Sequence, residues 1–154
     1  VTGVQTCALP IFRTRVLLLS LAIVCPPAQV QARIIVLTAA LSTENGTPQT
    51  SMPGYGAGRF IFDDQSNLLQ YSLTFDALTT PLLAVDIHGP GGMQSSAPAI
   101  AKLAIEDDPV HEGPYRGSLT LTPEQGAALL AGQLYIDIHT DLYRDGEIRG
   151  QIRP

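Results

Sequence analysis

Short runs in which apolar and polar residues alternate are the dominant pattern of the chain beyond residue 32. Between positions 68 and 76, for example, Leu69, Tyr71 and Leu73 alternate with polar residues. A strand points successive side chains to opposite faces, so this pattern is typical of a strand with one buried face. Comparable runs occur at 33–41, 55–63, 82–88, 99–105, 115–122, 133–140 and 147–153. Most are separated by segments rich in Gly, Pro, Asp or Asn, and the pattern predicts about eight short strands.

One segment, 122–132, has the features of a helix. Thr122 is a candidate N-cap, Pro123 suits the first helical position, and Gln125 stands where a capping box requires it. Gly132 can end this helix. Because strands do not alternate with helices along the chain, a parallel sheet is not expected. The sequence predicts an all-β fold, an antiparallel Greek-key β-sandwich or flattened barrel of about eight strands with one short helix.

Residues 1–11 resemble the translated read-through of a sequencing adapter, as found in genes assembled from environmental DNA. The first Met of the sequence, Met52, lies well inside the predicted domain. We therefore expect residues 1–11 to be an artefact that takes no part in the fold.

Residues 12–32 have the pattern of a secretory signal peptide. Arg13 and Arg15 precede an apolar run at 16–24 that is too short to span a bilayer as a stable helix. Small residues at and before Ala32 offer a cleavage site. The pattern predicts a secreted or periplasmic protein that does not contact a membrane once the signal is removed.

A single domain is then expected over residues 33–154. A lipid anchor at Cys25 is the alternative to cleavage after residue 32, although Val24 is larger than the residue that usually precedes a lipidated cysteine. The only other cysteine, Cys7, also precedes the domain, so the domain is expected to contain no disulfide.

The predicted domain is acidic. All 14 acidic residues of the sequence lie beyond residue 32, whereas two of the nine basic residues precede it, which leaves seven basic residues and a net charge of −7. A domain of this charge repels phosphate backbones, so no nucleic-acid partner is expected.

Two similar segments, AVDIHG at 84–89 and YIDIHT at 135–140, carry the candidate chemistry. In each, an Asp and a His two positions apart share one face of a predicted strand. The aliphatic residues on the other face of the first strand, Leu83, Val85 and Ile87, are expected to point into the core. The outer face then carries two acid–imidazole pairs: Asp86 with His88, and Asp137 with His139.

The last two strands are predicted to form a hairpin with its turn near Tyr143. Cross-strand partners lie on the same face, and this register places three pairs on the outer face: Asp137 with Arg149, His139 with Glu147, and Tyr135 with Gln151. On this interpretation the polar residues are structural, and Asp137 and Arg149 form a cross-strand ion pair. We expect the pairs to be partly buried under the loop 89–98.

A second interpretation applies if the two Asp-Ile-His strands are neighbours in the sheet. Two imidazoles and two carboxylates would then converge, and this donor set suits a borderline divalent ion such as zinc. The candidate metal ligands are Asp86, His88, Asp137 and His139. The spacing alone does not decide between a metal site and structural polar pairs.

Three longer segments extend these motifs: LLQYSLTFDALTTPLLAVDIHGPG at 68–91, GSLTLTPEQGAALLAGQLYIDIHT at 117–140 and GEIRGQIRP at 146–154. With them the chain resembles the chordin-type, or CHRD, domain family, and it is identified as an exported microbial single-domain member. The family has His at the position of Asp86 and Asn at that of Asp137. The resemblance implies a compact extracellular β-domain. In animal chordin such domains accompany modules that bind secreted growth factors, whereas the microbial members have no known activity.

The sequence favours a non-catalytic protein over an enzyme. It contains no nucleophile-elbow motif, no phosphate-binding loop and no cysteine in the predicted domain. We therefore predict an exported binding or structural module without catalytic residues, whose partner is a protein or a glycan. The alternative is a protein that binds a divalent metal through the twin strands, and no other cofactor is expected. The predicted binding or structural cluster consists of Asp86, His88, Asp137, His139, Glu147 and Arg149.

Overall fold

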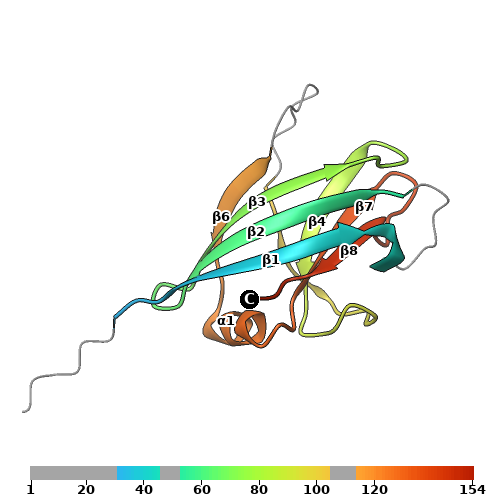
Figure 1. The fold of residues 1–154 in the computed structure, drawn as a ribbon. Coiled ribbons are helices and arrows are strands. Elements are labelled where there is room, and N and C mark those ends of the chain that lie inside the picture. Colours follow the sequence, from blue (N-terminus) through green and yellow to red (C-terminus); the bar gives the residue numbers. More distant parts are fainter. Residues whose placement is uncertain (1–30, 46–52, 105–113) are drawn as a thin grey trace, which may run out of the picture. The chain divides into compact units, whose positions relative to one another are not determined.

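The structure is a computed structural model that describes residues 31–45, 53–104 and 114–154 (Figure 1). The predicted artefact at 1–11 lies outside the described residues, as does the predicted signal peptide except for its last two residues, which are exposed. Within the described part of the chain, no helix has the length and apolar character needed to cross a membrane.

Eight antiparallel strands form one curled sheet, a half-barrel, in the order β5-β4-β7-β8-β1-β2-β3-β6 among the described residues (Figure 1). The strands are β1 Ile34–Ser42, β2 Tyr55–Asp63, β3 Leu68–Asp76, β4 Leu82–His88, β5 Ala99–Lys102, β6 Tyr115–Thr120, β7 Tyr135–Thr140 and β8 Ile148–Gln151. A short 3-10 turn, η1 Thr43–Asn45, follows β1, and the single α-helix is α1 Pro123–Leu130. The predicted all-β fold with one short helix is confirmed.

The core lies on the concave face of the sheet. Strands β1, β2 and β3 form a meander in which every second side chain is buried, as the alternating sequence predicts. Its inner face carries Leu37, Leu41, Phe60, Phe62, Leu69, Tyr71 and Leu73, all at most 5% exposed. The opposite face of the meander is largely open to solvent.

Helix α1 lies across one end of the sheet and carries the predicted N-terminal cap. Thr122 accepts a hydrogen bond from the Gln125 N–H, and the Gln125 side chain accepts one from the Thr122 N–H. Leu129 is fully buried, and Gly126 lies so near Phe62 that a Cβ there would meet the Phe62 ring at 2.9 Å. The helix thus closes the core against the β2 side chains.

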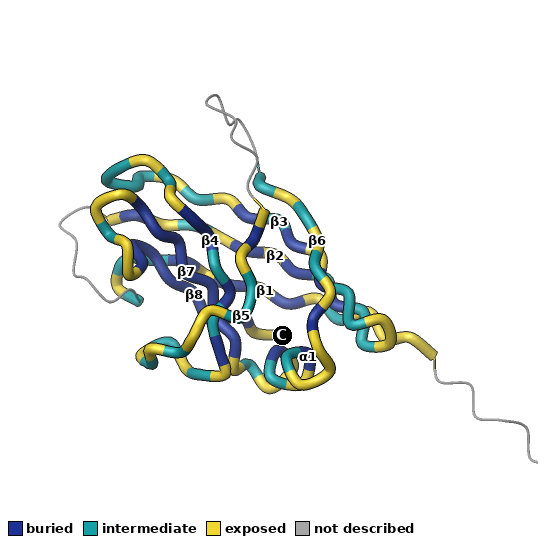
Figure 2. Tube along the Cα trace, turned by 180° about the vertical axis from the view of Figure 1, so that it is seen from behind, coloured by how far each residue is buried: buried dark blue, intermediate teal, exposed yellow. Residues whose placement is uncertain are grey.

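Strands β7 and β8 are buried on both faces, unlike the meander (Figure 2). Their inner face packs in the core, and their outer face lies under the loop between β4 and β5. The Gly91 N–H donates to the Gln133 carbonyl at 2.7 Å, and the Gln151 side-chain amide donates to the Gly91 carbonyl at 3.2 Å. The predicted burial of this polar face under the loop 89–98 is confirmed.

The prediction that Leu83 of β4 points into the core is wrong. Leu83 is 44% exposed, whereas Val85 and Ile87 are buried as predicted. The cause is an irregularity in the pairing with β7, where the register shifts between Leu82 and Ala84. An extra residue in one strand reverses the alternation on one side of it, and a period of two in the sequence does not show this.

Candidate functional site

The twin Asp-Ile-His segments are adjacent strands. β4 pairs antiparallel with β7, and in this register Asp86 stands opposite Asp137 while His88 stands opposite Tyr135. His139 stands opposite Ala84. The two acid–imidazole pairs therefore share the outer face of one strand pair, which is the condition that the metal interpretation requires.

Three of the four candidate ligands come together. Asp86, His88 and His139 each offer one ligand atom, and these atoms all lie within 4.8 Å of one another. The His139 Nε2 and the Asp86 Oδ2 are 3.4 Å apart. Two donors on one zinc ion, with bonds of about 2.0–2.2 Å in a tetrahedral arrangement, are about 3.3–3.5 Å apart. The spacing of this acid–imidazole pair already fits a shared ion.

Each imidazole is held by its other nitrogen. The His88 Nδ1 lies 2.9 Å from the Ala97 carbonyl oxygen, and the His139 Nδ1 lies 2.8 Å from the Arg144 carbonyl oxygen. A carbonyl oxygen only accepts, so Nδ1 carries the proton in both rings. In its neutral form, each ring then has a lone pair at Nε2. This arrangement is typical of metal-binding histidines, whose second nitrogen donates to a carbonyl or carboxylate.

The three inward-facing atoms lack partners. The Nε2 atoms of His88 and His139 and the Oδ1 of Asp86 are buried and make no hydrogen bond within the described residues. The 3.4 Å contact between His139 and Asp86 is longer than a charge-assisted hydrogen bond, which is about 2.7–2.9 Å. Buried polar atoms without protein partners cost free energy, so three in one place mark this cluster as a candidate binding site.

Asp137 belongs to a different set of contacts. Its carboxylate accepts from the Arg149 Nε, at 3.1 Å and 3.2 Å to its two oxygens, and from the Arg149 Nη2. Arg149 also donates from Nη1 to the carbonyls of Met93 and Ser95. The predicted pairing of Asp137 with Arg149 is confirmed, and this ion pair keeps the carboxylate out of the three-residue cluster. Gly146 is required beside it, because a Cβ there would lie 2.6 Å from an Asp137 oxygen and its φ is +106°.

The predicted contact between Glu147 and His139 is wrong. Glu147 is fully buried, and its carboxylate accepts from the Thr79 N–H at 2.7 Å and from the Thr140 hydroxyl at 2.6 Å. Glu147 precedes the first residue of β8, so the alternation of that strand does not fix the direction of its side chain. His139 faces Asp86 on β4 instead.

Tyr135 contacts the cluster, although the sequence analysis named it only as the cross-strand partner of Gln151. Its ring is stacked on the His88 ring, with centroids 5.2 Å apart and an interplanar angle of 8°, and Arg149 covers it at 4.4 Å from the centroid. Its hydroxyl accepts from the Ala97 N–H at 2.9 Å. Tyr135 therefore fixes both the His88 ring and the loop residue that holds it. Tyr135 lies two residues before Asp137 and therefore on the same outer face of the strand. This spacing was the signal in the sequence that could have identified it.

The cluster opens into a pocket of about 840 Å³. His88 and His139 line it together with Tyr135, and the loop residues Ser96 and Arg144 form part of its rim. Two of the three candidate ligand residues therefore line a pocket, although their Nε2 atoms are themselves buried.

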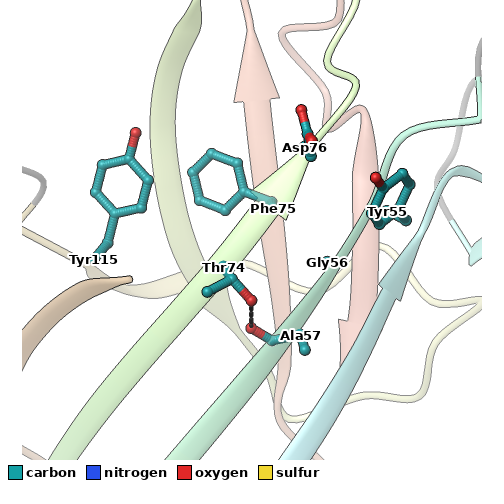
Figure 3. A pocket seen from close by; sticks show the side chains of 7 residues that line it. All are labelled: Tyr55, Gly56, Ala57, Thr74, Phe75, Asp76 and Tyr115. Carbon is teal, nitrogen blue, oxygen red and sulfur yellow. Dashed lines mark hydrogen bonds between the residues drawn. The ribbon is translucent and has the colours of Figure 1, made fainter. Parts of the chain in front are cut away.

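A second hollow, of about 610 Å³, lies at the ends of β2, β3 and β6. Figure 3 shows Phe75 and Tyr115 side by side, with Tyr55 beyond Gly56 on the adjacent strand. The Phe75 and Tyr115 rings are stacked, with centroids 4.8 Å apart, and Tyr55 is 58% exposed. This hollow offers aromatic faces and a carboxylate, from Asp76, but no cluster of metal ligands.

Comparison with known proteins identifies one family. The family model of the CHRD domain matches residues 37–152, which spans nearly all of the sheet from β1 to β8. No curated protein and no solved structure matches the chain.

Proposed function

The chain belongs to the CHRD-domain family, and we propose that it is an exported, non-catalytic binding module whose ligand is a divalent transition-metal ion. Asp86, His88 and His139 would hold the ion. The observation that supports this most strongly is the convergence of three buried donor atoms, each without a hydrogen-bond partner in the described part of the chain. An ion would supply the missing partner for all three.

The donor set favours zinc or copper(II). Imidazole nitrogens suit zinc, copper, iron and nickel, whereas calcium and magnesium prefer sites made of oxygen atoms. Two nitrogens and one carboxylate oxygen are also the ligands of one class of zinc site. Asp137, which the sequence analysis included among the ligands, is left out of the proposed site because Arg149 engages its carboxylate.

Export and the absence of catalysis rest on the sequence. The signal-peptide pattern at 12–32 supports a secreted or periplasmic location, and the lack of a nucleophile motif supports a binding role. Neither depends on the geometry of the metal cluster.

Metal titration of the purified, metal-stripped protein tests the proposal. Calorimetry and elemental analysis should give about one zinc or copper ion per chain. His88→Ala and His139→Ala should each lose more affinity than the about 10–100-fold that removal of an outer-shell partner costs. Asp86→Asn removes a ligand charge, and Asp141→Asn, at an exposed acid just after β7, is its matched control. The absence of stoichiometric binding, or equal affinities in all variants, would contradict the proposal.

Metal affinity should also decrease as the pH is lowered. Coordination requires the neutral imidazole, so protons compete with the ion for Nε2 of His88 and His139. We expect weaker binding at about pH 5 than at about pH 7.5.

The aromatic hollow favours a second candidate function, the binding of a glycan partner. Stacked rings such as Phe75 and Tyr115 offer flat apolar faces, and tyrosines add a polar edge. A sugar ring combines an apolar face with hydroxyl groups and would match both. Tyr55→Ala should weaken binding of soluble oligosaccharides in a ligand-observed NMR screen, and Ile34→Ala, at a residue that is 61% exposed, should not. Absence of oligosaccharide binding, or oligosaccharide binding that is unchanged by Tyr55→Ala, would exclude the glycan role of this hollow.

A further inference from the structure

The proposed metal site has too few protein ligands to close the coordination of an ion. Structural zinc sites have four protein ligands, whereas sites with three keep a position for water or another ligand. Within the described residues the cluster contains Asp86, His88 and His139 and no fourth acid, histidine or cysteine.

The nearest other donors are engaged elsewhere. The Asp137 carboxylate is bound by Arg149, and the Glu147 carboxylate is bound by Thr79 and Thr140. The Tyr135 hydroxyl accepts from the Ala97 N–H. Recruiting any of these groups would break a hydrogen bond or ion pair that already holds it.

The open side of the cluster faces a pocket that can admit a ligand. His88 and His139 both line the pocket of about 840 Å³, whereas Asp86 does not. Pockets for small molecules have volumes of about 300–1,000 Å³. The pocket therefore has room for a ligand larger than water beside the two imidazole rings, whose buried Nε2 atoms lie behind its lining.

The charge of the loaded site favours an anion. The charged residues that line the pocket are two acids, Asp137 and Asp145, and two bases, Arg144 and Arg149, so their charges cancel. A divalent ion held by one carboxylate and two neutral imidazoles leaves one positive charge in the first coordination shell. This positive charge would lie beside a pocket whose other charged residues have no net charge.

We infer that the metal-loaded site takes a small anion, such as a carboxylate or an inorganic oxyanion, as an exogenous ligand. The inference rests on the proposed metal binding. The anion enters through the pocket, displaces a metal-bound water into solvent and binds the ion directly. No covalent bond of the protein changes.

Azide titration of the copper(II)-loaded protein tests this inference. Azide bound to copper(II) gives a charge-transfer absorption band, and we expect a saturable band together with a changed electron paramagnetic resonance spectrum. Metal-loaded protein whose spectra do not respond to azide would overturn the inference and leave the proposed metal binding intact. Failure to bind copper at all would overturn both, and the metal titration would already have shown it.

A pair of rim variants tests the role of charge. Ser96 is exposed on the pocket rim, so Ser96→Glu adds a negative charge without touching a ligand, and Ser96→Gln is its neutral counterpart. Ser96→Glu should weaken azide binding about two- to fivefold relative to Ser96→Gln, and high salt should reduce the difference. Copper affinity should rise in Ser96→Glu relative to Ser96→Gln, because the added negative charge attracts the cation, so a loss of azide binding in Ser96→Glu would not reflect a loss of metal. Equal azide affinities would show that anions do not reach the ion through this pocket.

Discussion

The β1–β2–β3 meander and the β7–β8 pair belong to one sheet but are stabilised differently. Along the meander, exposed and buried side chains alternate, so one face is apolar and buried and the other is exposed to solvent. Along β7 and β8 every residue is buried, including Asp137, His139, Arg149 and Gln151. The meander depends on apolar packing, which tolerates change on its outer face. The β7–β8 pair depends on polar side chains that are paired with one another beneath a loop. If one partner is lost, the other remains buried in a low-dielectric environment without its hydrogen bond or counter-ion.

Loss of a buried charge should separate the two regions most clearly. Arg149→Met leaves the Asp137 carboxylate buried without its cation, and we expect a loss of about 3–5 kcal/mol in the free energy of unfolding. Arg59→Met, on the exposed face of β2, should change it by no more than about 0.5 kcal/mol. Urea unfolding of both variants measures the difference. Similar losses in the two would mean that the outer face of β7–β8 is no more sensitive than that of the meander.

A double variant sharpens this result. Adding Asp137→Leu to Arg149→Met removes the unmatched charge, and part of the lost stability should return. If the double variant is as unstable as Arg149→Met, the cost lies in the Arg149 contacts with the loop carbonyls rather than in the buried charge.

The turn into β8 should be the next most sensitive position. Gly146→Ala combines a left-handed backbone with a Cβ placed 2.6 Å from an Asp137 oxygen, and should cost about 1–3 kcal/mol. Gly92→Ala is the matched control, because no atom lies within 4 Å of its added Cβ. Thermal unfolding of the two variants should show a lower midpoint for Gly146→Ala alone. Equal midpoints would contradict the tight fit around Asp137.

The stacking residue of the metal cluster should act on affinity more than on stability. Tyr135→Phe keeps the ring over His88 but loses the hydroxyl that holds Ala97, so zinc affinity should fall about tenfold. Tyr55→Phe, outside the cluster, should leave zinc affinity unchanged. Calorimetric titration compares them, and unchanged affinity in Tyr135→Phe would show that the loop holds His88 without help from Tyr135.

The smallest effect is expected in the meander at alkaline pH. Burial raises the pKa of Tyr71, a core residue whose hydroxyl donates to the Ala104 carbonyl at 2.9 Å. The unfolded chain then loses the phenol proton at a lower pH than the folded chain, so stability is full below about pH 10 and falls as pH rises further. Tyr71→Phe should show a smaller decline between about pH 9 and pH 11. An equal decline in both proteins would assign the alkaline loss to other groups.

The parts of the structure that could be predicted from the sequence follow from two local rules. Apolar and polar residues alternate along a strand with one buried face, and cross-strand partners in a hairpin lie on the same face. Apolar residues at every second position identified the meander, and the helix cap at Thr122 required only local spacing. The pairing of Asp137 with Arg149 followed because partners in a hairpin share a face. These features depend on a few neighbouring residues, so one sequence is enough to derive them.

The errors and omissions lie where the backbone departs from a regular strand. The irregularity near Leu83 and the position of Glu147 before β8 both interrupt the alternation. The carbonyls of Ala97 and Arg144, which orient the two imidazoles, belong to loops. Backbone groups carry no signature in the sequence, so the orientation of the cluster could not be predicted even though its residues were.

The position of β1 in the sheet has a consequence for the order of folding. β1 lies between β2, its neighbour in sequence, and β8, the last strand, and Thr38 exchanges backbone hydrogen bonds with Arg153 near the end of the chain. Contacts between residues so far apart in sequence slow folding, because a large loop must close before they form. The meander can assemble early from contacts that are local in sequence, but the sheet stays open along β1 until β8 pairs with it. The pairing of β1 with β8 is therefore expected to form late, and stopped-flow refolding should place it in the slowest phase.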